Sequence, residues 1–114
     1  MARHSRHSDI SKVMDCLASP ERLKILECLV QAQGEINVSS LSDKTEMKQT
    51  TVSRHLRVLS DRGLVSLCKT GNYHHYLVDG ALIERALQEV KAMLRIEDNT
   101  MPRQPLVAAG EAFV

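Results

Sequence analysis

The hydrophobic period of this sequence changes twice, and the order of the periods constrains the fold more than any other feature. Apolar residues follow helical spacing up to Gly63, alternate with period 2 over residues 64–78, and return to helical spacing over 80–96. The turn signal Thr70-Gly71-Asn72 divides the alternating stretch and predicts a β-hairpin. A two-stranded hairpin is marginal alone, so it must lean on the helices around it. The predicted fold class is mainly α with one small β-hairpin.

Capping signals define the first two helices. The first is expected to begin at Ser8 or Asp9. The second begins at Ser19-Pro20, because serine caps a helix and proline suits the first helical position, and it ends before Gly34. The apolar residues expected to face inward are Ile10, Val13, Met14 and Leu17 in the first helix and Leu23, Leu26, Leu29 and Val30 in the second.

A short helix, a tight connector and a longer helix come next. The short helix is predicted to begin at Ser39 or Ser40 and to end near Thr45, and the longer one runs from about Gln49 to Arg62. This arrangement matches a helix-turn-helix, and the hairpin that follows would form its wing. The predicted architecture is therefore a winged helix-turn-helix of order α-α-α-α-β-β-α.

The longer helix carries the predicted DNA-reading surface. Val52, Leu56 and Leu59 face inward, which leaves a polar face opposite them. Amide, hydroxyl and guanidinium groups near the start of such a helix can reach base edges in the major groove. The residues predicted to read bases are Gln49, Thr50, Ser53 and Arg54. Those predicted to hold the DNA backbone, partly from the wing, are Lys48, Arg57, Lys69, Asn72 and His74.

The distribution of charge supports this interpretation better than the total. The net charge is only +1, but residues 48–76 hold five lysines and arginines against the single acid Asp61. Residues 79–98 are mildly acidic, so one face is suited to a polyanion and the other to a different role. A solvated helix face, or a winged helix that binds another protein, remains the alternative. The sequence shows no nucleophile with a base, phosphate loop or metal-ligand cluster, which argues against an enzyme.

The last helix has a wider apolar stripe than one small domain needs. With one Phe and no Trp, the core of this 114-residue chain is limited, and dimerisation would bury more surface. A homodimer interface is therefore predicted, and its residues are Ile83, Leu87, Val90 and Leu94 with Ile10, Val13 and Leu17.

The cysteines and histidines give weaker signals. Cys16, Cys28 and Cys68 are odd in number and widely spaced, and the chain shows no signal peptide or membrane-spanning run, which predicts a reduced cytoplasmic protein. The three thiols are redox candidates, although the favoured interpretation makes Cys16 and Cys28 small core residues and Cys68 a structural residue of the strand. His4 and His7 with Asp9 are a weak metal candidate, and no metal is assigned.

One structured domain is expected. Residues 1–8 are predicted as a flexible N-terminal segment, residues 9–97 as the DNA-binding and dimerisation domain, and residues 98–114, with two prolines and a glycine, as a C-terminal tail.

Three segments resemble the ArsR/SmtB family of winged-helix repressors. They are SPERLKIL at residues 19–26, TVSRHLRVL at 51–59 followed by Gly63-Leu64-Val65, and GNYHHYL at 71–77. The resemblance implies a homodimer joined by its first and last helices, an inverted-repeat operator in double-stranded DNA, and release by a metal, redox or small-molecule signal.

The chain departs from the resembled family at its sensor positions. The arsenic-type Cys-x-Cys has no counterpart at residues 37–41, and the zinc-type histidines have none at 80–96, so no cofactor is assigned. Lys48 also stands where the family often has a serine that caps the longer helix. A lysine side chain cannot accept a hydrogen bond from the first N–H groups of the helix, and its positive charge is disfavoured at the positive, N-terminal end of the helix dipole.

Overall fold

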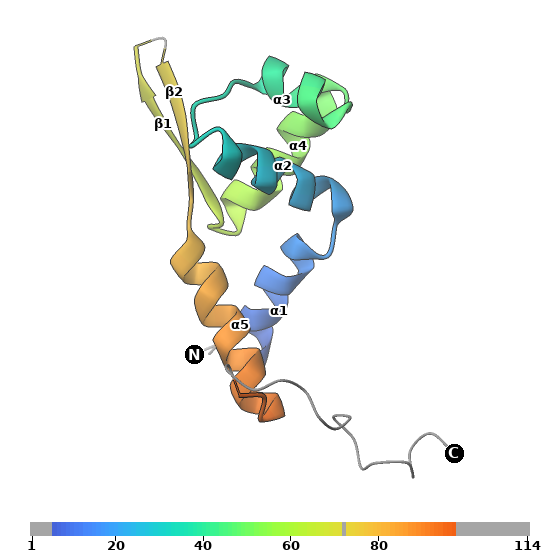
Figure 1. Ribbon diagram of the computed structural model, residues 1–114, viewed down its shortest axis with the longest axis vertical. Coiled ribbons are helices and arrows are strands. Elements are labelled where there is room, and N and C mark those ends of the chain that lie inside the picture. Colours follow the sequence, from blue (N-terminus) through green and yellow to red (C-terminus); the bar gives the residue numbers. More distant parts are fainter. Residues whose placement is uncertain (1–5, 72, 98–114) are drawn as a thin grey trace, which may run out of the picture.

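Five helices and a two-stranded hairpin make up the fold of the computed structural model, which describes residues 6–71 and 73–97 (Figure 1). The elements are α1 (Arg6–Leu17), α2 (Pro20–Gln31), α3 (Val38–Thr45), α4 (Gln49–Asp61), β1 (Val65–Thr70), β2 (Tyr73–Val78) and α5 (Gly80–Leu94). The predicted order and fold class are confirmed. Helix α1 begins before the expected boundary, so residues 6–8 belong to it, whereas residues 1–5 and the predicted tail lie outside the described residues.

Side-chain caps fix where three of the helices begin. The Ser19 hydroxyl accepts a hydrogen bond from the backbone N–H of Arg22 at 3.2 Å, as the Ser-Pro signal predicts. Asp79 caps α5 by accepting from the N–H of Leu82 at 3.0 Å. Helix α3 is capped by Asn37 rather than by Ser39 or Ser40, because the Asn37 side chain accepts from the N–H of Ser40 at 2.8 Å.

The core lies where α2, α3, α4 and the base of the hairpin meet. Its fully buried side chains are Cys16, Ile25, Leu29, Leu41, Val52, Leu59 and Leu64. The prediction for α2 was partly wrong, because Leu23 and Val30 are 48% and 62% exposed while Ile25 is fully buried. Both possible stripes of this helix are apolar and share Leu26 and Leu29, so spacing alone could not choose the face that contacts α3 and α4.

The hairpin is antiparallel and leans on α2 through its second strand. Its register runs from Val65 opposite Val78 at the base to Thr70 opposite Tyr73 at the tip. Val65 and Tyr76 are buried, whereas the described side chains near the tip are exposed. The Tyr76 N–H donates to the Gly34 carbonyl at 3.0 Å, which ties the loop after α2 to β2.

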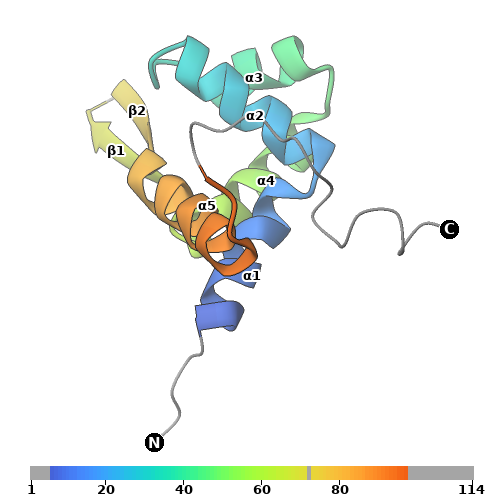
Figure 2. The same cartoon turned by 60° about the horizontal axis from the view of Figure 1, so that its bottom comes forward.

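Helices α1 and α5 lie side by side at the end of the molecule opposite α3 and the tip of the hairpin (Figures 1 and 2). The hairpin tip is therefore separated from this helix pair. Within residues 6–71 and 73–97, no helix has the length and hydrophobicity needed to cross a bilayer.

Candidate nucleic-acid interface

The two faces of α4 are divided as its sequence pattern predicts. Val52, Leu56 and Leu59 are buried against the core, which holds the helix in place. The opposite face is exposed and carries all five polar side chains singled out on this helix, Gln49, Thr50, Ser53, Arg54 and Arg57. The fold thus brings together the amide, hydroxyl and guanidinium groups whose geometry suits base edges and phosphates.

The turn before α4 is held by short-range hydrogen bonds. Glu46 takes a left-handed conformation with φ of 60°, which ends α3 and lets the Met47 N–H donate to the Ser42 carbonyl at 3.2 Å. The Ser42 hydroxyl donates in turn to the Met47 carbonyl. Thr45 is buried, and its hydroxyl donates to the Leu41 carbonyl at 2.6 Å. This turn sets the direction in which α4 leaves α3.

The N-terminus of α4 has no side-chain cap. Lys48 occupies the N-cap position in an extended conformation and makes no capping hydrogen bond, and the first turn contains no acidic residue. The first N–H groups of a helix have no partner within the helix and favour an anion such as phosphate. Lys48 adds a positive charge at the same place.

The described wing residues are exposed at its outer end. Lys69 lies opposite His74 in the register, and Cys68 lies opposite His75. Lys69, His74 and Cys68 are exposed, so all three are accessible near the tip. Asn72 lies outside the described residues, and its predicted contact stays a prediction.

Not every cation of the basic segment faces outward with α4. Arg62, the C-cap residue of this helix, donates to the Lys12 carbonyl at 3.1 Å and lies 3.4 Å from the Asp15 carboxylate of α1. Arg22 of α2 also bonds the end of α1. Neither interaction was predicted from the sequence, because both depend on how the helices pack against one another.

The predicted dimer residues fall into three groups by their exposure in the single chain. Ile10 and Val13 are buried within the single chain between α1 and α5, so they support this helix pair from inside. Leu17, Ile83 and Val90 are half-buried. Leu87 and Leu94 are 44% and 54% exposed, and Ile96, which the sequence analysis did not include, adds to them at 38%. The interface itself stays a prediction.

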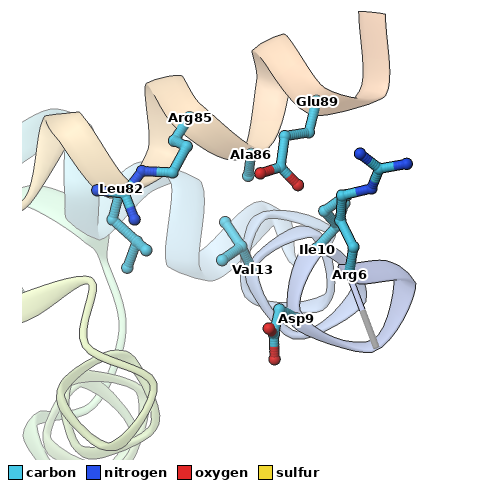
Figure 3. Close-up of a pocket in the computed structure, with 8 residues that line it drawn as sticks. All are labelled: Arg6, Asp9, Ile10, Val13, Leu82, Arg85, Ala86 and Glu89. Carbon is cyan, nitrogen blue, oxygen red and sulfur yellow. The ribbon is translucent and has the colours of Figure 1, made fainter. Parts of the chain in front are cut away.

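A cleft of about 380 Å³ lies between α1 and α5 (Figure 3). Ile10, Val13 and Ala86 form its apolar base. Charged side chains stand at its rim, two from each helix, and they are Arg6, Asp9, Arg85 and Glu89. One of its two walls, α5, also carries the exposed Leu87 and Leu94.

The cysteines occupy three different environments. Cys16 is fully buried, and burial raises the pKa of its thiol despite the nearby guanidiniums of Arg62 and Arg22. Cys28 is half-buried and Cys68 is exposed on β1. Among the residues that the structure describes, no three His, Cys, Asp or Glu side chains form a group able to hold a metal ion. His7 is exposed, and His4 lies outside the described residues.

A short helix, a tight turn, an exposed polar helix and an adjoining β-hairpin define a winged helix-turn-helix protein. The family profile described as bacterial regulatory protein, arsR family, matches residues 19–66. The chain is 30% identical over 84 residues to an arsenical resistance operon repressor of Staphylococcus aureus, an alignment that covers 74% of this chain and 79% of that protein. The chain therefore belongs to the ArsR family, and it is a DNA-binding transcriptional repressor rather than an enzyme.

Solved structures agree with this assignment. A homodimeric winged helix-turn-helix DNA-binding domain from Mycobacterium bovis superposes with a TM-score of 0.59 at 29% identity, covering 90% of this chain and 100% of that one. The transcriptional repressor BigR from Xylella fastidiosa gives a TM-score of 0.58 at 27% identity, covering 83% and 92%.

Proposed function

We propose that this protein acts in the cytoplasm as a homodimer that binds an inverted-repeat operator and represses transcription. Each protomer would place α4 in the major groove and its wing along the neighbouring backbone. Gln49, Thr50, Ser53 and Arg54 would read bases, whereas Lys48, Arg57, Lys69, Asn72 and His74 would hold phosphates.

The observation that carries the proposal is the exposed face of α4. Its side chains are all donors or acceptors, its first turn contains no acid, and its uncapped N-terminus lies beside Lys48. Unpaired N–H groups at a helix N-terminus attract anions, so a bound phosphate would offset the unfavourable charge of Lys48 at the positive end of the helix dipole.

Dimerisation is supported by the exposed leucines of α5. Leu87 and Leu94 stand on the helix pair α1 and α5, opposite the wing tip, so pairing there would leave both copies of α4 free. The M. bovis relative is described as homodimeric, and the C₂ symmetry of such a dimer would match an inverted repeat.

Release from the operator by a metal, redox or small-molecule signal belongs to the same proposal. The S. aureus relative is named for arsenical resistance, but this chain lacks the Cys-x-Cys at residues 37–41. Operator titrations with and without reductant and divalent metals would separate the signals. A change on oxidation alone would implicate a cysteine, and a change with metal alone would implicate histidines.

A binding assay on the DNA upstream of the protein's own gene tests the proposal. Arg54→Ala should weaken operator binding by about 1–3 kcal/mol and random-sequence binding much less, because a bidentate base contact is lost. Arg57→Ala should weaken both kinds of DNA alike and reduce the salt dependence, since it removes a phosphate contact.

Lys12→Ala is the matched control, because it removes one exposed positive charge from α1, outside α4 and the wing. Equal losses on operator and random DNA for Arg54→Ala would contradict base reading. No binding at low salt by the unmodified protein would contradict the proposal and favour a protein-interaction role.

A further inference from the structure

Two arginines from different helices meet at the C-terminal turn of α1. Arg22 of α2 donates through Nε to the Cys16 carbonyl at 2.9 Å and through Nη2 to the Asp15 carbonyl at 3.0 Å. The last carbonyls of a helix have no partner within it, and a guanidinium there satisfies them and suits the negative end of the dipole. Arg22 therefore fixes the end of α1 to the start of α2.

The same guanidinium also faces α4. Its Nη1 atom lies 3.5 Å from Nδ1 of His55, which is half-buried in the middle of that helix. Burial, and then the positive charge of Arg22, lower the pKa of His55, although Glu21 opposes this and Arg54 adds to it. A neutral imidazole can accept a hydrogen bond at Nδ1, so Arg22 bridges the end of α1 to α4.

Arg62 makes a second bridge at the far end of α4. Its Nη1 atom donates to the Lys12 carbonyl at 3.1 Å and lies 3.4 Å from Oδ2 of Asp15. The side chains of Arg62 and Asp15 are 36% and 63% exposed, so their ion pair contributes little to stability. Its effect is directional, because a hydrogen bond has a preferred geometry whereas the hydrophobic effect is non-directional.

Two attachment points fix the direction of the α4 axis, whereas a single point would let the helix pivot about it. His55 and Arg62 are seven positions apart, which corresponds to about 10 Å along a helix. Both points are joined to the same turn of α1, residues 12–16. Polar contacts near the middle and at the end of α4 therefore fix its orientation relative to α1.

We propose that Arg22 and Arg62 are positioning residues that set the angle of α4 relative to the dimer axis, and with it the operator spacing that the dimer accepts. The inference rests on the proposed function, in which α1 and α5 join the two protomers. In such a dimer, the angle between α1 and α4 determines how far apart the two copies of α4 lie, and half-site spacing follows from that distance. Neither arginine needs to touch DNA for this role.

Operators with the same half-sites and spacers longer or shorter by one or two base pairs provide the test. The unmodified full chain should prefer one spacer by roughly tenfold, because each added base pair turns a half-site by about 34° and its base contacts are lost. For Arg62→Ala, this preference should fall to about threefold or less, whereas affinity for a single half-site should stay within about twofold. A merely structural defect would lower both affinities together.

Conservative variants and a control sharpen the experiment. Arg62→Lys should restore the spacing preference, because an ammonium group can still donate to the Lys12 carbonyl and the Asp15 carboxylate. Arg22→Lys should not restore it, since one ammonium cannot span two carbonyls and His55 as a planar guanidinium does. Lys12→Ala removes a charge from the same turn but keeps the carbonyl that Arg62 binds, so its spacing profile should match the unmodified protein.

The outcomes separate this inference from the function beneath it. An unmodified protein that binds no operator at any spacing would overturn the proposed function and the inference together. Normal binding with an unchanged spacing profile in Arg62→Ala would overturn the inference alone, as would equal losses on half-sites and full sites. If a variant at Arg22 fails to fold, Arg62→Ala and Asp15→Ala test the same inference. Asp15→Ala removes the carboxylate that faces Arg62 but leaves both acceptor carbonyls of Arg22 in place.

Discussion

Gly34 has a backbone conformation and a close contact that only glycine accommodates. It has φ of +81°, and its carbonyl accepts the N–H of Tyr76 from β2. A Cβ atom at this position would overlap the Tyr76 carbonyl oxygen and lie 2.9 Å from Nε2 of His75. The absence of a side chain is therefore what lets the loop after α2 approach the wing.

Gly34→Ala should destabilise the protein by more than about 2 kcal/mol. The left-handed conformation alone costs an L-residue about 1–2 kcal/mol, and the overlap with the Tyr76 carbonyl adds to it. Thermal unfolding at fixed protein concentration should show a loss of roughly 4–8 °C per kcal/mol. Gly80→Ala is the matched control, because it lies at the start of α5 with no atom within 4 Å, and it should be neutral or stabilising by up to about 1 kcal/mol. Similar melting temperatures for the two variants would contradict this account.

Some residue roles could be predicted from the sequence and others could not. Ser19 as a cap follows from its position before Pro20, because capping depends on neighbours three residues away. Arg22 and Arg62 bond groups six to fifty positions away, and their partners are mostly backbone carbonyls, which every residue carries. Contacts of this kind depend on how the helices pack against one another, so no local sequence pattern predicts them.

At the scale of elements, α4 differs from its neighbours in how it begins. Helices α2, α3 and α5 each have a side chain that accepts from the first turn, whereas Lys48 leaves α4 without one. The missing cap lowers the stability of α4, but it leaves the first N–H groups and the lysine able to bind a phosphate. Lys48 is therefore a candidate for a residue kept for function at a cost in stability.

Lys48→Ser should make the protein more stable and a weaker DNA binder. A serine cap contributes about 0.5–2 kcal/mol, so the free energy of unfolding in urea should rise by that amount. Loss of one phosphate contact should weaken operator and random DNA alike and reduce the slope of log K against log salt by about 1. The control is Lys12→Ser, which makes the same exchange inside α1, where the backbone N–H groups are already paired. It should neither stabilise the protein nor change the salt dependence of DNA binding. A stabilised variant with unchanged salt dependence would show that Lys48 does not contact phosphate.

Element boundaries followed from local chemistry, but the buried face of a helix did not always do so. The second strand and α4 begin where predicted, because a turn signal precedes the strand and a tight connector precedes the helix. Gly63, with φ of +82°, lies just beyond the end of α4. In α2, two overlapping apolar stripes were available, and only contact with α3 and α4 selects Ile25 over Leu23. A helix with apolar residues on more than one side leaves this choice to tertiary structure.

The whole molecule places its two proposed functional surfaces at opposite ends. The tip of the wing and α3 lie at one end, and the α1 and α5 pair at the other (Figure 1). Leu87, Leu94 and Ile96 are exposed on the second surface. A single exposed leucine needs no explanation, but several exposed apolar residues near one end of a helix favour contact with a partner chain. Because the two surfaces are apart, dimerisation and DNA binding can be perturbed separately.

Replacing Leu87 and Leu94 together by glutamate should break the dimer while leaving each chain folded. Two carboxylates facing their symmetry mates would be costly to bury, whereas both side chains are already about half exposed in the single chain, so the fold loses little. Sedimentation should show a monomer, circular dichroism should stay helical, and binding to the inverted repeat should fall to that of a single half-site. The matched control is Leu23→Glu with Val30→Glu on α2, which adds the same charges at residues of similar exposure outside α1 and α5. A dimer that survives in the first variant, or dissociates equally in the second, would place the interface elsewhere.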